Sequence, residues 1–284
     1  MCSPQVMELV HGEPGHSCAD HATDAGTAQD AASGQDGARP AERPRTPAPL
    51  IRGSRVSDLT HAFGNDFPVL EPIVLKPNIE HFADIASEGF NANKLEIDEH
   101  TGTHVDGPAH LIDGPVYTDE IPIDRLIAPL CVIRIGERAA KDPDTTLTAD
   151  DILAWERRHG RIPDGALVVM DSGWCPRIDT PGAYINRDAD GIPHFPGLGF
   201  DAAELLVRER SIVAAGTDTP SLDASKNLQI DDPGAHRIVL GDLRYGVENI
   251  ANLHTVPDVG ATAVVGLIRH RKGFAGPCRM FGIH

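Results

Sequence analysis

The stretch HTGTHVDGPAH, from His100 to His110, places three histidines and one aspartate within eleven residues. Its glycines and its proline disfavour a helix, so the stretch predicts an extended strand that runs into a turn. In the preceding run NKLEIDEH, Leu95 and Ile97 are apolar, and Lys94, Glu96 and Asp98 at the alternate positions are charged. This alternation is typical of a half-buried strand, and we expect it to continue into the motif.

Continued alternation places His100, His104 and Asp106 on one face, with only Gly102 between the two histidines. Imidazole nitrogen combined with carboxylate oxygen suits Zn²⁺, Mn²⁺ or Fe²⁺. A lone histidine is more often an ordinary surface or core residue than a ligand. A cluster of this density instead predicts a divalent metal site.

Composition restricts the classes of partner. The 284-residue chain has a formal net charge of −17 and a pI near 5.1, which argues against nucleic acid or an anionic membrane as a general partner. We find no apolar run approaching the roughly 20 residues that span a bilayer, and the N-terminal residues do not resemble a secretory signal. Five scattered cysteines without a CxxC pair indicate reduced thiols. We therefore expect a cytoplasmic protein with a small-molecule partner.

The first 50 residues differ from the rest of the chain. They contain no Phe, Trp or Tyr and are dense in Ala, Gly, Asp, Pro and Ser. Such a segment buries too little apolar surface to offset its ordering entropy, so the sequence predicts a disordered tail over residues 1–50. Apolar periodicity begins just beyond it, which predicts one folded domain over residues 51–284.

Within that domain, predicted strands outnumber predicted helices. Strands are expected near residues 130–135, 166–171, 212–216 and 262–270, and residues 247–253 read as an edge strand or a loop. Helices are expected over 148–160, where Thr148 and Asp151 match a capping box, and over 201–210 with Asp201 as its cap. The long loop after residue 171 is expected to border a site. This order favours a mixed-sheet, barrel-like α/β fold over a doubly wound nucleotide-binding sheet.

The motif resembles the HxGTHxDxPxH signature of the cyclase family of metal-dependent hydrolases, which includes bacterial kynurenine formamidases and isatin hydrolases. Further segments resemble the family in the same order: SDLTHAF, IPIDRLIAP, DSGW, HFPGLGFDAAELL, GTDTPSLD and GFAGPCRMFGI. The similarity covers roughly residues 55 to 284. It implies a single domain with the family's barrel-like swivelling β/β/α fold.

The resemblance also implies roles for individual residues. A later histidine and a glutamate twelve residues beyond it complete the metal site in the family, and this chain has His236 and Glu248 at that separation. The implied ligands are His100, His104, Asp106, His236 and Glu248. His110 matches the family's catalytic acid/base. The implied cofactor is Zn²⁺ or Mn²⁺, with one or two ions per subunit, and the implied assembly is a homodimer or homotetramer.

A substrate site is expected beside the metal. Phe67, Trp174 and Phe195 are candidates for an aromatic wall, although Trp174 is equally suited to core packing. Ser221 is a candidate substrate contact. Its neighbours Asp218, Thr219 and Asp223 suit either a supporting role at the site or ordinary turn chemistry.

The expected activity is metal-dependent hydrolysis of an amide-like C–N bond in a small formamide or cyclic amide, aromatic ones included. The loop near residues 176–196 is longer than in a minimal kynurenine formamidase, which weakens N-formylkynurenine as the substrate. Two alternatives stay open. One is a non-catalytic protein that binds metal or ligand, and the other is a lactone hydrolase or cyclase on the same scaffold.

Overall fold

A computed structural model describes residues 55–114, 116–229 and 234–284. The predicted disordered tail, residues 1–50, lies outside the described residues. Among the described helices, none is long and apolar enough to cross a membrane.

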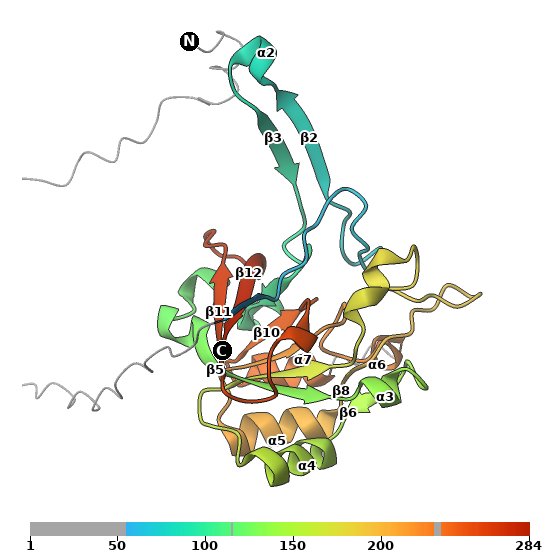
Figure 1. The fold of residues 1–284 in the computed structure, drawn as a ribbon, viewed down its shortest axis with the longest axis vertical. Coiled ribbons are helices and arrows are strands. Elements are labelled where there is room, and N and C mark those ends of the chain that lie inside the picture. The colour runs from blue at the N-terminus through green and yellow to red at the C-terminus, as the bar shows by residue number, and fades with distance from the viewer. Residues whose placement is uncertain (1–54, 115, 230–233) are drawn as a thin grey trace, which may run out of the picture. The chain divides into compact units, whose positions relative to one another are not determined.

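The described strands and helices follow one another along the chain as shown in Figure 1. The strands are β1 (Val56–Asp58), β2 (Asn78–Ala83), β3 (Ala92–Glu96), β4 (His104–Asp106), β5 (Ile127–Arg134), β6 (Thr146–Leu147), β7 (Leu167–Asp171), β8 (Gly197–Leu198), β9 (Ala214–Thr217), β10 (Tyr245–Glu248), β11 (Ala261–Leu267) and β12 (Ala275–Ile283). The helices are α2 (Ile85–Glu88), α3 (Gly136–Ala139), α4 (Ala149–His159), α5 (Phe200–Arg210), α6 (Ser225–Gln229) and α7 (Gly234–Gly241). Short 3₁₀ turns include η1 (Pro108–His110) and η4 (Cys175–Asp179).

The main sheet closes into a barrel. Its strands pair in the order β12-β11-β5-β7-β9-β10-β4, and β4 pairs back onto β12, while β1 adds to β12 from outside this ring. Neighbours among β5, β7, β9 and β10 are parallel, and the other pairs are antiparallel. The predicted mixed-sheet, barrel-like α/β class is confirmed. Strand β10 lies between β9 and β4, so the expectation of an edge strand is wrong for Val247 and Glu248, whereas residues 249–253 lie outside the strands, as expected for a loop.

The central parallel strands β5, β7 and β9 are largely buried on both faces. In β5, Leu130 and Val132 belong to one hydrophobic cluster, and Cys131 and Ile133 belong to another that includes residues of α4, α5 and α7. Helices α4 and α5 lie side by side against the face of the barrel that carries Cys131 and Ile133 (Figure 1). Burial on both faces explains why these strands read as continuous apolar runs rather than as alternating patterns.

The two long helices begin differently from each other. The predicted capping box of α4 is confirmed, because Thr148 accepts from the Asp151 amide and Asp151 accepts from the Thr148 amide. The predicted cap of α5 is wrong: Gly199 is its N-cap, and Asp201 accepts instead from the Ala149 amide at the start of α4. A Cβ on residue 199 would lie 2.7 Å from the Leu147 carbonyl oxygen, so no side chain fits at the cap.

The expected continuous strand through the motif is also wrong. Strand β3 ends at Glu96, the chain turns, and β4 starts only at His104. Gly102 adopts φ +68° in this turn, and a Cβ there would lie 3.0 Å from Phe63 Cδ1. Leu95, expected on a buried face, is 53% exposed. The motif's glycine therefore takes a left-handed conformation in a bend between β3 and β4 rather than leaving a gap along a strand.

Residues His81–Asn93 form a compact unit apart from the remaining described chain. They contain α2, which Asp84 caps by accepting from two backbone amides and which Gly89 ends in a left-handed conformation. His81 Nδ1 lies 2.9 Å from Asn93 Oδ1. Everything discussed below belongs to the other unit, residues 51–80 and 94–284.

The long loop after β7 is fastened by a histidine. His194 Nδ1 lies 2.8 Å from Asp144 Oδ2, and the second oxygen of Asp144 accepts from Ser225 Oγ at 2.9 Å. The hydrogen bond to Asp144 is the main reason that the pKa of His194 is raised. This carboxylate thus ties the end of the loop to the start of α6.

The contact between His194 and Asp144 is expected to contribute to stability in a pH-dependent way. Because the folded pKa is raised, the contribution is present below the ordinary histidine pKa of about 6.5 and is lost as pH rises through the folded value. Urea unfolding from about pH 6 to pH 8 should therefore show a smaller fall in the free energy of unfolding for Asp144→Asn than for wild type. An unchanged slope in the variant would contradict this role.

Candidate metal centre

Two antiparallel strands place three of the predicted ligands together. In the register of β4 with β10, His104 lies opposite Glu248 and Asp106 lies opposite Gly246. Val105 and Val247 belong to the hydrophobic cluster inside the barrel, so the alternate residues project from the other face. A Cβ on residue 246 would lie 2.8 Å from Leu222 Cδ1 and 3.4 Å from Asp106 Oδ2, so glycine leaves room for the carboxylate.

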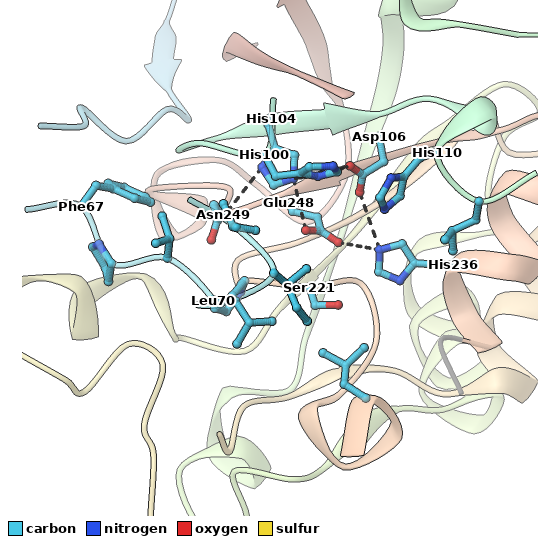
Figure 2. Close-up of a pocket in the computed structure, with 17 residues that line it drawn as sticks. Phe67, Leu70, His100, His104, Asp106, His110, Ser221, His236, Glu248 and Asn249 are labelled. Carbon is cyan, nitrogen blue, oxygen red and sulfur yellow. Dashed lines mark hydrogen bonds and ion pairs between the residues drawn. The ribbon is translucent and has the colours of Figure 1, made fainter. Parts of the chain in front are cut away.

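The remaining predicted ligands come from the motif turn and from α7, which packs on β10. His100 Nδ1 lies 3.0 Å from Asp106 Oδ1 and 3.2 Å from His104 Nε2. His236 Nε2 lies 2.9 Å from Glu248 Oε1 and 3.7 Å from Asp106 Oδ2. Figure 2 shows these side chains converging from three parts of the chain. The structure thus brings all five predicted ligands into one cluster.

The cluster contains more hydrogen-bond acceptors than donors. His104 Nδ1 lies 2.9 Å from the Gly102 carbonyl oxygen, so it carries the proton that this contact requires. In the neutral ring, Nε2 then offers a lone pair, yet it faces Asp106 Oδ1 at 3.5 Å and Glu248 Oε2 at 3.3 Å. Both oxygens of Asp106 are buried and accept no hydrogen bond of acceptable geometry, although His100 Nδ1 lies 3.0 Å from Oδ1. Acceptors that face one another in this way fit a divalent cation.

The pKa shifts of the clustered residues also indicate that the buried carboxylates require positive charge beside them. Burial alone would lower the pKa of His104, but Asp106 and Glu248 outweigh it and raise the pKa to about 10. Burial opposes ionisation of Asp106, yet the neighbouring histidines hold its pKa well below the ordinary range. Without a metal, protonated histidines supply the positive charge that the carboxylates require. A divalent ion would supply it instead while leaving the imidazole nitrogens as ligands.

His110 lies at the edge of this cluster. Its ring centroid is 4.5 Å from that of His100 and 6.3 Å from that of His236. Burial is the main reason that its pKa is lowered, so the neutral ring is favoured. Two groups of residues have ligand atoms mutually within 4.8 Å: His100, Asp106 and His110 form one, and His104, Asp106 and Glu248 form the other. Position alone therefore allows His110 either as a ligand or as a proton carrier.

A pocket of about 130 Å³ opens onto the cluster. Its polar lining consists of the six clustered residues with Ser221 and Asn249, and its remaining lining is apolar. The apolar residues are Phe67, Pro68, Val69, Leu70, Ile73, Val74, Leu111, Pro220 and Leu228. None of the described residues that line it is Lys or Arg. The pocket therefore offers metal-type ligands at one side and an uncharged apolar surface at the other.

The candidate substrate residues fall into two groups. Phe67 and Ser221 line the pocket. Trp174 and Phe195 do not: they are fully buried and pack with Leu70 in a separate hydrophobic cluster. The long loop expected to border the site contributes no described lining residue, and it instead supports the pocket wall from behind through this cluster.

Asn249 is a site residue that sequence reasoning missed. Its Nδ2 donates to the Gly102 carbonyl, and its Oδ1 accepts from the Tyr184 hydroxyl at 2.8 Å. It adopts φ +53°, a conformation that asparagine tolerates better than most residues. Its place directly after Glu248 was the available signal. It connects the motif turn to the long loop.

Comparison with known proteins agrees with this geometry. The Cyclase family model matches residues 57–224. The chain belongs to the cyclase family. Isatin hydrolase of Roseibium aggregatum is 36% identical over 250 residues, which cover 83% of this chain and 94% of that protein. Kynurenine formamidase of Salinibacter ruber is 27% identical over 57% of this chain and 65% of its own length.

Comparison with solved structures agrees with the cyclase-family assignment. The solved structure of isatin hydrolase A from Labrenzia aggregata, bound to benzyl benzoate, superposes with a TM-score of 0.76 at 34% identity, covering 81% of this chain and 93% of that one. The predicted family is confirmed. The predicted enzyme class, a metal-dependent hydrolase that cleaves an amide-like C–N bond, is confirmed as well by these relatives.

Proposed function

We propose that the protein hydrolyses a neutral cyclic amide or a neutral aryl formamide in the pocket that opens onto the cluster of proposed metal ligands. The observation that carries this proposal is the combination of a buried, acceptor-rich cluster with an apolar pocket wall. The relatives support both substrate types, because one is named for isatin, a cyclic amide, and the other for a formamide.

The proposed ligands are His100, His104, Asp106, His236 and Glu248, and the proposed cofactor is Zn²⁺ or Mn²⁺. Asp106 belongs to both groups of neighbouring ligand atoms, and the proposed stoichiometry is one or two ions per chain. When bound, the ion supplies a Lewis acid that polarises the scissile carbonyl and makes hydroxide available at neutral pH.

We assign proton transfer to His110. Its lowered pKa keeps the ring neutral, so one of its nitrogens can accept a proton from the attacking water. The same nitrogen then delivers that proton to the leaving amide nitrogen. The apolar wall orients a flat substrate beside it and limits the entry of bulk water.

The pocket favours neutral substrates over charged ones. N-formylkynurenine carries an ammonium and a carboxylate, and the described lining offers no Lys or Arg to the carboxylate. Burying an unpaired charge costs several kcal/mol. A cyclic amide such as isatin has no such group.

A substrate panel tests this preference. We expect the Mn²⁺- or Zn²⁺-loaded protein to hydrolyse isatin or formanilide with a kcat/KM at least about 100-fold above that for N-formylkynurenine. An aryl lactone in the same panel tests whether the scaffold accepts an ester. N-formylkynurenine as the best substrate, or no hydrolysis of any amide by metal-loaded protein, would contradict the proposal.

The family resemblance supports a proposal about the assembly as well. We expect a homodimer or homotetramer in the cytoplasm, acting on a freely diffusing small molecule. The acidic composition agrees with a small-molecule partner rather than nucleic acid.

A further inference from the structure

A further buried carboxylate lies directly behind the cluster of proposed metal ligands. Asp223 is completely buried, and its Oδ2 lies 2.6 Å from His236 Nδ1. The opposite nitrogen of that ring, Nε2, faces Glu248 and Asp106. The imidazole of His236 thus lies between a carboxylate at its back and the proposed metal ligands at its front.

This contact selects one tautomer of the ring. A carboxylate is an acceptor only, so Nδ1 must carry the proton that fills the 2.6 Å contact. With the proton on Nδ1, the lone pair of the neutral ring lies on Nε2 and is directed at the cluster. The other tautomer would set the Nδ1 lone pair against the carboxylate.

The same carboxylate also fixes the backbone that carries the ring. Its Oδ1 accepts from the Ala235 amide at 2.9 Å and its Oδ2 accepts from the His236 amide at 3.0 Å. Both amides are in the first turn of α7 and have no partner within the helix. Asp223 therefore holds the position of His236, the direction of its ring and the location of its proton.

We propose that Asp223 is a positioning residue, which presents His236 Nε2 to a divalent ion by holding a proton on Nδ1. The inference rests on the proposed metal site and adds to it the residue that makes His236 a competent ligand. His104 needs no such carboxylate, since the Gly102 carbonyl occupies its Nδ1. In other proteins, comparable partners of metal-bound histidines change affinity by about 10- to 100-fold when mutated.

The test is the Mn²⁺ affinity of the full-length chain, measured by isothermal titration calorimetry. We expect Asp223→Asn to weaken Mn²⁺ binding by about 10- to 100-fold in the wild-type background. If Asp223 acts through His236, the same substitution should change affinity by less than about 2-fold in a His236→Gln background. An unchanged affinity in Asp223→Asn, or an equal loss in both backgrounds, would overturn the proposal.

A matched control uses the other histidine–aspartate contact described above. Asp144→Asn also removes a carboxylate from a histidine Nδ1, but that histidine, His194, does not belong to the cluster of proposed metal ligands. We expect its Mn²⁺ affinity to equal that of wild type. Failure of wild type itself to bind Mn²⁺ or Zn²⁺ would count against the proposed function, whereas a normal wild type with an insensitive Asp223→Asn would count against the positioning role alone.

A measurement on the wild-type protein covers the case in which Asp223→Asn does not fold. Nitrogen-15 NMR of the Zn²⁺-loaded protein reports which imidazole nitrogen carries a proton, and the His236→Gln spectrum identifies the His236 signals. We expect a protonated Nδ1 and a metal-bound Nε2. A protonated Nε2 at His236 would overturn the proposal.

Discussion

Asp106→Asn is expected to abolish stoichiometric metal binding and to lower kcat/KM by at least about 1,000-fold. The carboxylate is completely buried, belongs to both ligand groups and has two oxygens that accept no hydrogen bond of acceptable geometry. Asparagine has nearly the same size but carries no charge and presents only one acceptor. Because the ion lowers the pKa of water by roughly 8 units, its loss removes most of the available hydroxide at neutral pH.

Asp218→Asn is the matched control for that substitution. Asp218 is equally buried, accepts from Ser172 and Trp174, and does not line the pocket. Burial, aided by Asp171, raises its pKa to about 6. We expect this variant to retain its metal by elemental analysis. Full metal content and turnover in Asp106→Asn would contradict the assignment of Asp106.

The second large effect is expected at His110. His110→Gln should lower kcat by about 100- to 10,000-fold, the usual contribution of a positioned general acid/base. Metal content should stay at the wild-type value, because the proposed ligands are intact. Turnover by steady-state kinetics and metal by elemental analysis, measured on the same sample, separate the two roles.

Loss of metal in His110→Gln would show that His110 is a ligand, which the grouping with His100 and Asp106 allows. Unchanged kcat with intact metal would remove it from the mechanism. His159→Gln serves as the control, since His159 lies on α4 beside Asp258 and away from the pocket. We expect no change in either measurement for that variant.

The sequence predicted which residues lie together at the site, but it did not predict the local path of the chain. The spacing of His236 and Glu248, read through the family resemblance, identified two residues far along the chain that the structure places beside His104 and Asp106. Apolar runs identified β5, β7 and β9, because burial on both faces leaves a continuous signal.

Other features depended on contacts that no local pattern encodes. The motif turns at Gly102 instead of continuing a strand, because Phe63 and the β4–β10 pairing set the path there. Trp174 and Phe195 are suitable for an aromatic wall by composition, but the long loop directs them into a buried cluster. Aspartate is common at helix caps, yet the cap of α5 is Gly199, two residues before Asp201, where the Leu147 carbonyl leaves no room for a side chain.

Metal titration of the dialysed wild-type protein tests the central claim most directly. After treatment with a chelator and its removal, the protein should be inactive towards isatin and formanilide. Added Mn²⁺ or Zn²⁺ should restore hydrolysis in proportion to bound metal, with a plateau at one or two ions per chain. Undiminished amide hydrolysis by metal-free protein would contradict the account.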